Sequence, residues 1–373
     1  MRYRAVKNIY LVVEDTWLIG MGKKRIAVLG GTGYVGRLLA RHLVGHERYE
    51  LGPIVGSDAS AGKKYSTVWI EKEARLVENY GDLWSPQSFP PEYTHRVVET
   101  IEAVTHMTCD FVISCLAPTV EGAEEQIIDK KIPLFSMCPR NRKGNLYVAE
   151  VNMEQMIQRI HAGSLLFKTP NCVVCGLSIL LKAISQMQEV REACVTTIQS
   201  ISGRGDALYS TERIVHNVMP LGNSGEDTQF CIQRELTDLC NIPAVSVRAY
   251  RVGVHAGHTI DLRLRLANRV SEQEVLLHLR NFSVVIPFGC CARPHACISV
   301  QLFDGSPHPR QTSIDHKFAK GMQVLVGNVE VDSDGWDLCM TLVLNNLILG
   351  AYGSVLQLVD IFERVVTQQE VSA

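Results

Sequence analysis

One cysteine lies where proteins commonly place a nucleophile. Cys172 follows Thr169, Pro170 and Asn171, at the junction between a short strand and the first turn of a long apolar helix. Amide donors and the helix dipole at such a junction favour a thiolate, so we expect the pKa of Cys172 to be lowered. Because a thiolate attacks acyl carbons, this position predicts covalent catalysis by Cys172.

The same residue forms a CxxC motif with Cys175, and a redox pair is the competing interpretation. A redox motif of this kind normally follows the first strands of its own domain. Here Cys175 comes one helical turn after Cys172, where it can equally be a small buried side chain. Another group invites a zinc interpretation: Cys290, Cys291, His295 and Cys297. It lacks a second ligand pair with suitable spacing, so we predict packing there and no metal site.

A later strand offers a cation and an imidazole. Arg251 begins the run RVGVHAGH and can pair with a carboxylate, and His258 ends it and can transfer a proton. The chain has 12 histidines, so composition alone favours a structural role for any one of them. The roles of both residues therefore depend on their neighbours in the fold.

Three glycines predict a dinucleotide site. Gly31, Gly33 and Gly36 follow the apolar run 24–30 and precede a segment, 34–46, with apolar residues at helical spacing. The first glycine permits a tight turn, the second lets the backbone approach a pyrophosphate, and the third lets helix and strand pack closely. We expect the cofactor to contact this turn: Gly31, Thr32, Gly33, Tyr34, Val35 and Gly36.

One strand later, a loop lies where the adenosine ribose should bind. Its hydroxyls and lysines, including Ser57, Ser60 and Lys63, suit the 2′-phosphate of NADP. Asp58 in the same loop suits the ribose hydroxyls of NAD instead. The loop therefore favours NADP and leaves NAD open.

Alternating strands and helices through the first part of the chain predict a parallel sheet. Residues 110–116, 120–131 and 132–136 are predicted as strand, helix and strand. Beyond Asn152 come a helix over 172–189 and openly alternating strands such as 261–266, which favour an antiparallel or mixed sheet. Further elements are predicted at 165–168 (strand), 195–202 (strand), 271–281 (helix with a Ser271 and Glu274 capping box) and 346–366 (helix).

The predicted fold class is α/β. An N-terminal Rossmann-like dinucleotide-binding domain is followed by an α+β catalytic and dimerisation domain with a mixed sheet, and the C-terminal helix returns to the first domain. We place the N-terminal extension at 1–21, the first domain at 22–168 with 346–373, and the second domain at 169–345.

Length and composition exclude several protein classes. The 373 residues are 46% hydrophobic and 20% charged, and a formal charge of −2 supplies no net field for nucleic acid or an anionic membrane. The apolar segment 9–21 is interrupted by Glu14 and Asp15, so no membrane span is predicted. Twelve cysteines without a signal peptide fit reduced thiols, which predicts a cytoplasmic protein starting at Met1 or Met21.

With these motifs in this order, the sequence resembles aspartate-semialdehyde dehydrogenase, particularly its archaeal and fungal branch. The match runs from about Lys24 to the C-terminus. Six motifs carry it: GGTGYVG at 30–36, SDASAGKKY at 57–65, TPNC at 169–172, QSISGRG at 199–205, RVGVHAGHT at 251–259 and NLILGAYGSVLQ at 346–357. Agreement of several spaced motifs makes chance similarity a remote explanation.

The resemblance implies roles for single residues. Cys172 matches the family's nucleophile, and Gln199 matches a glutamine that helps to position the acyl intermediate. Arg251 matches the residue that binds the substrate carboxylate, and His258 matches the acid/base. Cofactor contacts are implied for a loop and for the start of the terminal helix: Ser202, Gly203, Gly205, Asn346 and Gly350.

The implied reaction is reductive dephosphorylation of an acyl phosphate. L-4-aspartyl phosphate would acylate Cys172 with loss of phosphate, and NADPH would reduce the thioester to L-aspartate 4-semialdehyde while His258 relays protons. This reaction belongs to the aspartate-derived route to lysine, threonine and methionine. The implied partners are this small substrate and phosphate, and the implied assembly is a homodimer or homotetramer joined through the sheet of the second domain.

Several stretches depart from the family pattern. The phosphate-binding run reads SMCPRNR at 136–142, in which Arg142 keeps the spacing of the phosphate-binding arginine. The choice between Arg140 and Arg142 as the residue that meets the phosphate stays open. Glu226 or Asp227 can still meet the substrate ammonium group, but Gln229 replaces a lysine. Ala59 replaces a common arginine of the 2′-phosphate loop. These changes weaken the phosphate and NADP assignments more than the thiol chemistry.

Two alternatives remain open. An acyl reductase of the malonyl-CoA reductase type fits the altered phosphate site, since its acyl carrier is not phosphate. A non-catalytic dinucleotide-binding relative has no chemical need for the four residues matched to catalytic and substrate roles. N-acetyl-γ-glutamyl-phosphate reductase shares the domain plan but normally has glycine where Asn171 precedes Cys172, which argues against it.

Overall fold

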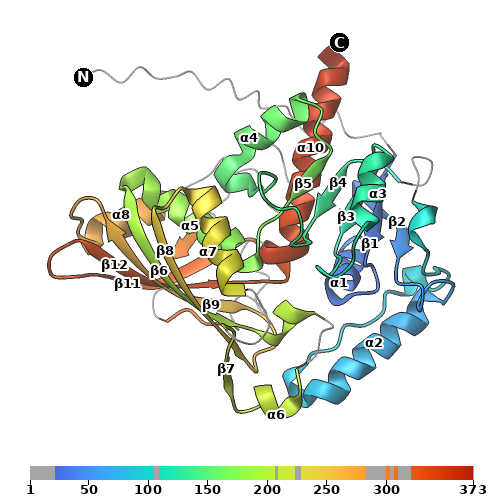
Figure 1. Cartoon of the computed structure of the whole chain (residues 1–373), viewed down its shortest axis with the longest axis horizontal. Coiled ribbons are helices and arrows are strands. Elements are labelled where there is room, and N and C mark those ends of the chain that lie inside the picture. Colours follow the sequence, from blue (N-terminus) through green and yellow to red (C-terminus); the bar gives the residue numbers. More distant parts are fainter. Residues whose placement is uncertain are drawn as a thin grey trace.

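The elements of the chain divide between two sheets (Figure 1). The computed structural model describes these residues: 22–104, 109–205, 209–222, 228–282, 300–302, 306–309 and 321–372. Among them, no helix is both long and apolar enough to cross a membrane.

The first sheet is parallel throughout, with strand order β2-β1-β3-β4-β5. Its elements are β1 (Lys24–Leu29), α1 (Tyr34–His42), β2 (Tyr49–Val55), α2 (Tyr65–Tyr80), β3 (Phe111–Ser114), α3 (Ala123–Asp129), β4 (Leu134–Ser136), α4 (Ala149–His161) and β5 (Leu166–Lys168). All four residues of β3 are buried, as in a strand covered on both faces. The expected Rossmann-like architecture is confirmed.

The second sheet is mixed, with strand order β10-β11-β12-β9-β6-β8-β7. The pairs β6/β8 and β10/β11 are parallel and the others are antiparallel. Its elements are α5 (Cys172–Met187), β6 (Val190–Gln199), α6 (Thr211–Ile214), β7 (Val218–Pro220), α7 (Thr228–Cys240), β8 (Ala244–Val252), β9 (His258–Leu266), α8 (Glu272–Asn281), β10 (Val300–Leu302), β11 (Val324–Val331) and β12 (Asp337–Leu344).

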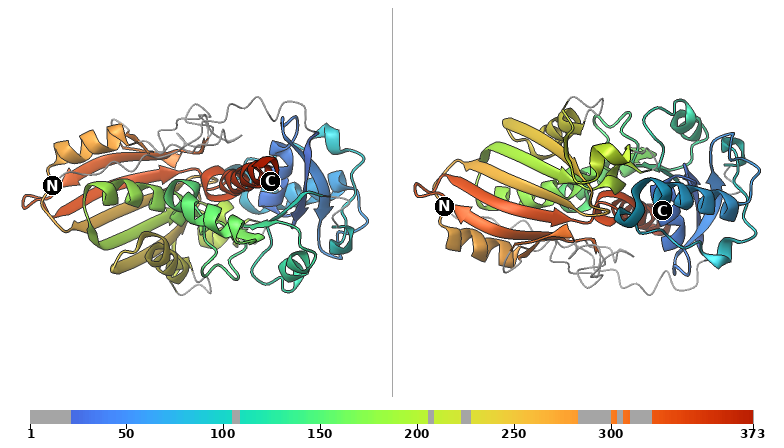
Figure 2. Two further views of the ribbon diagram at one scale, coloured as in Figure 1. Left: turned by 90° about the horizontal axis from the view of Figure 1, so that it is seen from above. Right: turned by 90° about the horizontal axis from the view of Figure 1, so that it is seen from below.

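One face of this sheet carries the larger apolar core. Leu262 and Leu264 of β9 are fully buried among side chains of α5, α7 and α8. The intervening Arg263 and Arg265 lie on the opposite face, with side chains 62% and 48% exposed. The strands of this sheet are seen in the right-hand view of Figure 2. The predicted alternation of leucine and arginine is confirmed, because successive side chains of a strand point to opposite faces.

The C-terminal segment returns to the first sheet, as expected. Side chains of α10 (Gly353–Ser372) join the core formed by β1, β3, β4 and β5. Arg48, next to β2, pairs with both Asp360 and Glu363 of α10. The prediction of one helix from 346 was incomplete: a π-helical turn, η7 (Ile348–Tyr352), comes first, with a break at Ala351.

Element limits differ by a few residues from the predictions. The helix predicted to begin at 120 starts at Ala123, because Gly122 takes a left-handed conformation (φ 76°) as its N-cap. The strand predicted over 195–202 spans Val190–Gln199. The capping box between Ser271 and Glu274 is confirmed at the start of α8. The domain limits at 168 and 345 stay a proposal, which the separation of the two sheets supports.

Candidate active site

The turn between β5 and α5 holds the candidate nucleophile. Asn171 caps α5, and its side-chain Oδ1 accepts the Val173 amide at 2.9 Å. The thiol of Cys172 donates to the same oxygen at 3.7 Å. On its other side, Cys172 Sγ lies 3.2 Å from Nε2 of His258, the first residue of β9. The fold therefore brings together two predicted catalytic residues that are 86 positions apart.

Hydrogen bonds fix the orientation of His258. The backbone amide of Ser200 donates to Nδ1 at 3.1 Å, and the Ser200 hydroxyl lies 3.2 Å from the same nitrogen. A backbone amide can only donate, so Nδ1 is an acceptor and the proton of the neutral ring sits on Nε2. This tautomer directs an N–H toward the sulfur of Cys172.

The expected lowering of the thiol pKa is wrong. Burial raises the pKa of Cys172, and the cations of Arg251 and Arg142 and nearby amides lower it by less. Burial, with a smaller contribution from Arg251, lowers the pKa of His258 to about 3. The resting pair is therefore a neutral thiol and a neutral imidazole, because desolvation disfavours both charged forms.

Arg251 lies beside this pair. It is buried, its Nη1 donates to the Ser200 carbonyl at 2.9 Å, and its Nε donates to the Tyr209 hydroxyl at 3.2 Å. A Cβ on Gly203 would lie 2.9 Å from Arg251 Nη1 and 3.2 Å from His258 Cε1. Glycine at 203 thus leaves the space between the cation and the imidazole open.

Gln199 ends β6 opposite Arg251 in the parallel register of β6 and β8. Its side chain is buried, and Nε2 donates to Thr197 Oγ1 at 3.0 Å, along its own strand. The structure therefore places Gln199 at the edge of the site, with its amide group turned toward β6.

The start of the terminal segment also reaches the site. Asn346 Oδ1 accepts the Gly257 amide at 2.8 Å and the Ser200 hydroxyl at 3.2 Å, and its Nδ2 donates to Ser202 Oγ at 3.1 Å. Asn346 thereby joins the two loops that flank His258. A sequence pattern could not reveal these bonds, since the partners lie far apart along the chain.

The glycine turn has the form expected for a phosphate cradle. A Cβ on Gly36 would lie 2.4 Å from the Gly30 carbonyl, and one on Gly31 would lie 2.7 Å from the Ile54 side chain. Gly33 is the N-cap of α1, whose first turn has no acidic residue and no side-chain cap. The amides at the start of α1 therefore fit a pyrophosphate.

Other predicted cofactor residues surround that turn. Tyr34 does not face open space: its hydroxyl lies 3.1 Å from His255 Nε2, in the loop before His258. The Thr32 carbonyl accepts Arg37 Nη1 at 2.7 Å, and Val35 is half-buried. Residues of the second loop follow β2: Ser60 Oγ donates to the Ser57 carbonyl at 2.9 Å, and Lys63 is exposed.

The candidate phosphate arginine, Arg142, is buried and already paired. Its Nη1 donates to Glu235 Oε1 at 2.7 Å and its Nη2 to the Met137 carbonyl at 2.7 Å. The other carboxylate oxygen, Oε2, accepts the Asn171 amide at 2.6 Å. Sequence reasoning missed Glu235, although a glutamate within the apolar stripe of α7, next to Leu236, was a usable signal.

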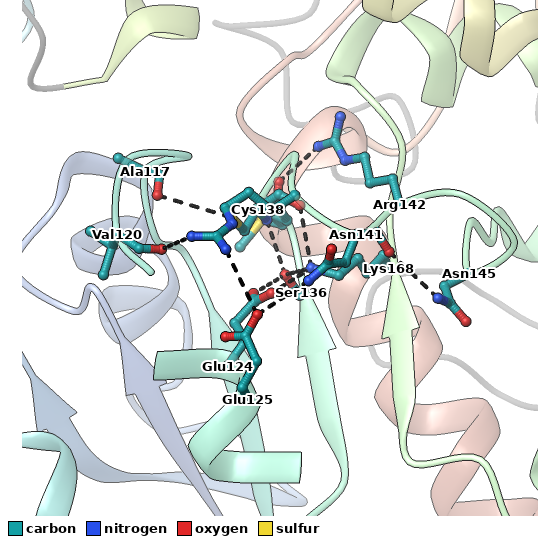
Figure 3. Close-up of polar contacts among 12 residues, drawn as sticks. Ala117, Val120, Glu124, Glu125, Ser136, Cys138, Asn141, Arg142, Asn145 and Lys168 are labelled. Atoms are coloured by element: carbon teal, nitrogen blue, oxygen red, sulfur yellow. Dashed lines mark hydrogen bonds and ion pairs between the residues drawn. The ribbon is translucent and has the colours of Figure 1, made fainter. Parts of the chain in front are cut away.

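A second buried cluster lies at the ends of β4 and β5, in the neighbourhood of Arg142 (Figure 3). The Lys168 ammonium donates to Glu124 Oε2 at 2.5 Å and to Ser136 Oγ at 3.0 Å. The Cys138 amide donates to the same hydroxyl at 3.0 Å. Sequence analysis gave no role to Lys168 or Glu124, and the structure makes them an internal ion pair.

The competing motifs take other positions. Cys172 and Cys175 are both free thiols, and Cys175 contacts the Pro170 carbonyl instead of its CxxC partner. Gln229 Oε1 accepts the Ala249 amide at 2.9 Å. Some predicted residues lie outside the described ranges: Glu226, Cys290, Cys291, His295 and Cys297.

Comparisons with known proteins agree on one family. A model of the semialdehyde dehydrogenase NAD-binding domain matches residues 25–159. Aspartate-semialdehyde dehydrogenase of Aspergillus fumigatus is 30% identical over 359 residues, which cover 89% of this chain and 95% of that protein. The enzyme of Methanothermobacter thermautotrophicus is 26% identical over 349 residues, 88% of this chain and 96% of that protein.

Solved structures show the same relationship. The crystal structure of aspartate-semialdehyde dehydrogenase with NADP from Candida albicans superposes with a TM-score of 0.74 at 25% identity. The superposition covers 92% of this chain and 99% of that one. Because the Aspergillus protein is 30% identical over most of both chains, this chain belongs to the aspartate-semialdehyde dehydrogenase family.

Proposed function

We propose that this chain catalyses the NADPH-dependent reductive dephosphorylation of L-4-aspartyl phosphate to L-aspartate 4-semialdehyde, through a thioester on Cys172. The observation that carries the proposal is the 3.2 Å contact between Cys172 Sγ and His258 Nε2 at the start of α5, beside the buried Arg251. Family membership supports the reaction class. The contact supplies a nucleophile and a proton donor that can both reach the acyl carbon of the substrate.

Acylation uses the thiol and the imidazole as the hydrogen bonds arrange them. The sulfur attacks the acyl carbon, the carbon–oxygen bond to phosphate breaks, and the departing phosphate carries away the thiol proton. His258 donates its Nε2 proton in a hydrogen bond to the developing thiolate. Because Nδ1 accepts the Ser200 amide, this support comes from a neutral ring.

Reduction follows on the same sulfur. When bound, NADPH supplies the hydride that the thioester carbon accepts. His258 Nε2–H then stabilises the oxygen that gains charge, and as the aldehyde forms, the carbon–sulfur bond breaks and returns the thiolate to that same N–H. The N–H of one imidazole thus serves both the sulfur and the oxygen, and a proton taken up from solvent returns the thiolate to the resting thiol.

Charged side chains orient the substrate. We assign the α-carboxylate to Arg251, whose guanidinium lies next to His258, and the acyl group to the neighbourhood of Gln199. We assign the phosphate to Arg142, because its Nε is buried and has no hydrogen-bond partner among the described residues. The substrate ammonium group is assigned to Glu226, which lies outside the described ranges.

The cofactor assignment rests on the glycine turn and on a relative. Amides of the turn 31–36 would hold the pyrophosphate, and Ser57, Ser60 and Lys63 would meet the 2′-phosphate. Ser202, Gly203 and Asn346 would line the nicotinamide end, with Asn346 acting through its bonds to both loops. The Candida albicans relative was solved with NADP, which supports NADP over NAD.

The test is phosphate-dependent reduction of NADP by L-aspartate semialdehyde, followed at the nicotinamide absorbance. Wild-type protein should turn over only when phosphate is present, the Cys172→Ala variant should be inactive, and NAD should be the poorer cofactor. Folded, NADP-binding protein that shows no turnover would contradict the proposal.

One observation favours a second candidate. Arg142 is neutralised by Glu235, and Gln229, which stands in place of a family lysine, holds the Ala249 amide. These are the groups that would meet a phosphate, so an acyl reductase with another acyl carrier, such as malonyl-CoA, is the alternative. Release of free CoA from malonyl-CoA with NADPH, in protein that fails the phosphate assay, would establish it.

We also propose that the chain assembles as a homodimer, or a pair of dimers, through the second sheet. Its face away from α5, α7 and α8 exposes Arg263 and Arg265, and Ile198 of the adjacent β6 is 38% exposed. Light scattering at micromolar concentration should give twice or four times the monomer mass. A measured mass equal to that of the monomer would refute the proposed assembly and would leave the catalytic proposal unaffected.

A further inference from the structure

Glu235 is a fully buried carboxylate in the middle of α7. Ile232, one helical turn before it, and the adjacent Leu236 belong to the apolar core of the second sheet. Burying a carboxylate is costly unless it is paired and hydrogen-bonded. Packing alone would be served by leucine at this position, so the charge calls for another explanation.

Both oxygens of this carboxylate are used, and they hold different parts of the chain. Oε1 accepts Arg142 Nη1 at 2.7 Å, from the loop after β4. Oε2 accepts the backbone amide of Asn171 at 2.6 Å, from the turn before α5. One side chain of α7 therefore joins the candidate phosphate arginine to the cap of the nucleophile helix.

The Asn171 contact bears directly on Cys172. Asn171 directs its side chain to the Val173 amide and the Cys172 thiol, and its own amide is fixed by Glu235. Moving this backbone unit would rotate the start of α5 and change the 3.2 Å approach of Cys172 to His258. Misplacement of reacting groups by about 1 Å can cost about 100-fold in rate.

The Arg142 contact controls a charge near the sulfur. Among the described residues, the charged groups that act on Cys172 are Arg251 and Arg142, with the neutral His258 in contact. Glu235 neutralises Arg142 and leaves only its Nε without a partner among the described residues. The Glu235 carboxylate therefore reduces the positive potential that Arg142 exerts on the resting thiol. It also holds the guanidinium in place, so that the remaining donor, Nε, has a fixed orientation.

We propose that Glu235 is a positioning residue that couples the anion-binding Arg142 to the nucleophile turn of Cys172. Its assignment to catalysis rests on the proposed function, whereas its effect on Cys172 can be measured without any substrate. Two readouts should move in opposite directions when its charge is removed: the thiol becomes more reactive at neutral pH, and turnover falls.

The test uses the full-length protein and the Glu235→Gln variant, whose single amide oxygen can accept from only one of the two donors. Iodoacetamide labelling of Cys172, followed by mass spectrometry between pH 6 and 10, should become about threefold or more faster at pH 7, because Arg142 is no longer neutralised. The kcat for L-aspartate semialdehyde should fall about tenfold or more, with the KM for NADP unchanged.

Glu73 provides a matched control. It is also buried, and it holds Arg37 Nη2 at 2.9 Å with one oxygen and the Gln87 amide at 3.0 Å with the other. Glu73→Gln removes the same chemistry from α2 and should leave Cys172 labelling within twofold of wild type. A general loss of stability would affect both variants, whereas the proposed role affects labelling only in Glu235→Gln.

A second variant keeps the test valid if Glu235→Gln does not fold. Replacing both charges, in Arg142→Met with Glu235→Leu, removes the buried pair without leaving either charge alone. It should fold, keep a labelled Cys172 and lose turnover. The inference is overturned if either variant, once folded, keeps wild-type kcat, or if Glu235→Gln keeps the wild-type labelling profile. Absence of turnover in the wild type would refute the proposed function and leave the labelling test standing.

Discussion

Gly350 lies next to the nucleophile, Cys172. Adding a single methyl group at this position, in the Gly350→Ala variant, tests whether the terminal segment positions Cys172. A Cβ at this residue would lie 2.3 Å from Cys172 Cβ, 2.7 Å from its Cα and 3.1 Å from its carbonyl oxygen. Carbon atoms in ordinary contact are about 3.5 Å apart, so the two segments would have to separate by about 1.2 Å. The obstructing atoms are backbone and Cβ, which cannot rotate aside.

The displacement sets the expected magnitude in Gly350→Ala. Inserting a methyl group into a packed site costs about 1–3 kcal/mol of stability. A shift of about 1 Å between reacting groups costs about 100-fold in rate. Gly350 is not among the glycines with positive φ, so the effect is steric and not conformational. We expect kcat to fall about 100-fold in a protein that still folds.

Two assays measure this effect: NADP reduction by L-aspartate semialdehyde with phosphate, and urea unfolding. Gly22→Ala is the control, because a Cβ there would meet no atom of the described residues within 4 Å. The control should match wild type in both assays. The reasoning is refuted if folded Gly350→Ala keeps kcat within threefold of wild type, since the terminal segment would then not position Cys172.

Further predictions concern the buried charges. The pKa of His258 is about 3 in the folded chain and near 6.5 in the unfolded chain, so the unfolded state binds the extra proton between these values. Stability should therefore fall as the pH drops below 6.5, by about 1.4 kcal/mol per pH unit from this group. The His258→Asn variant should lose this part of the pH dependence when its free energy of unfolding in urea is compared at pH 6.5 and 5.0. An equal pH dependence in the variant and the wild type would contradict the prediction. Because burial raises the pKa of Cys172, iodoacetamide labelling should still be accelerating above pH 9, and a plateau near pH 7 would show a preformed thiolate. Glu124→Gln leaves the buried charge of Lys168 without its carboxylate partner, and should cost about 3–5 kcal/mol in thermal unfolding, whereas Glu124→Leu with Lys168→Met should be nearly neutral; equal losses would show that the charge pair itself is unimportant.

Local sequence determined the parts of this fold whose causes are local. The glycine turn before α1 follows from three residues that permit close backbone approach, and the capping box at Ser271 follows from two side chains three positions apart. Alternating leucine and arginine in β9 follows from the period of a strand. Even the position of Cys172 at the start of α5 follows from its neighbours, Pro170 and Asn171.

Contacts between distant segments decided the chemistry of the site. The pKa of Cys172 is raised because the packed segments around it exclude water, and no feature of the local motif carries that information. The tautomer of His258 depends on the amide of Ser200. The backbone amide of Asn171, in the turn before Cys172, donates to Glu235, which lies 64 positions later in the chain. Sequence alone therefore determined which elements form and which residues are able to react. The tertiary structure decided their charge, their partners and their orientation, because desolvation and long-range hydrogen bonds exist only once the chain has packed.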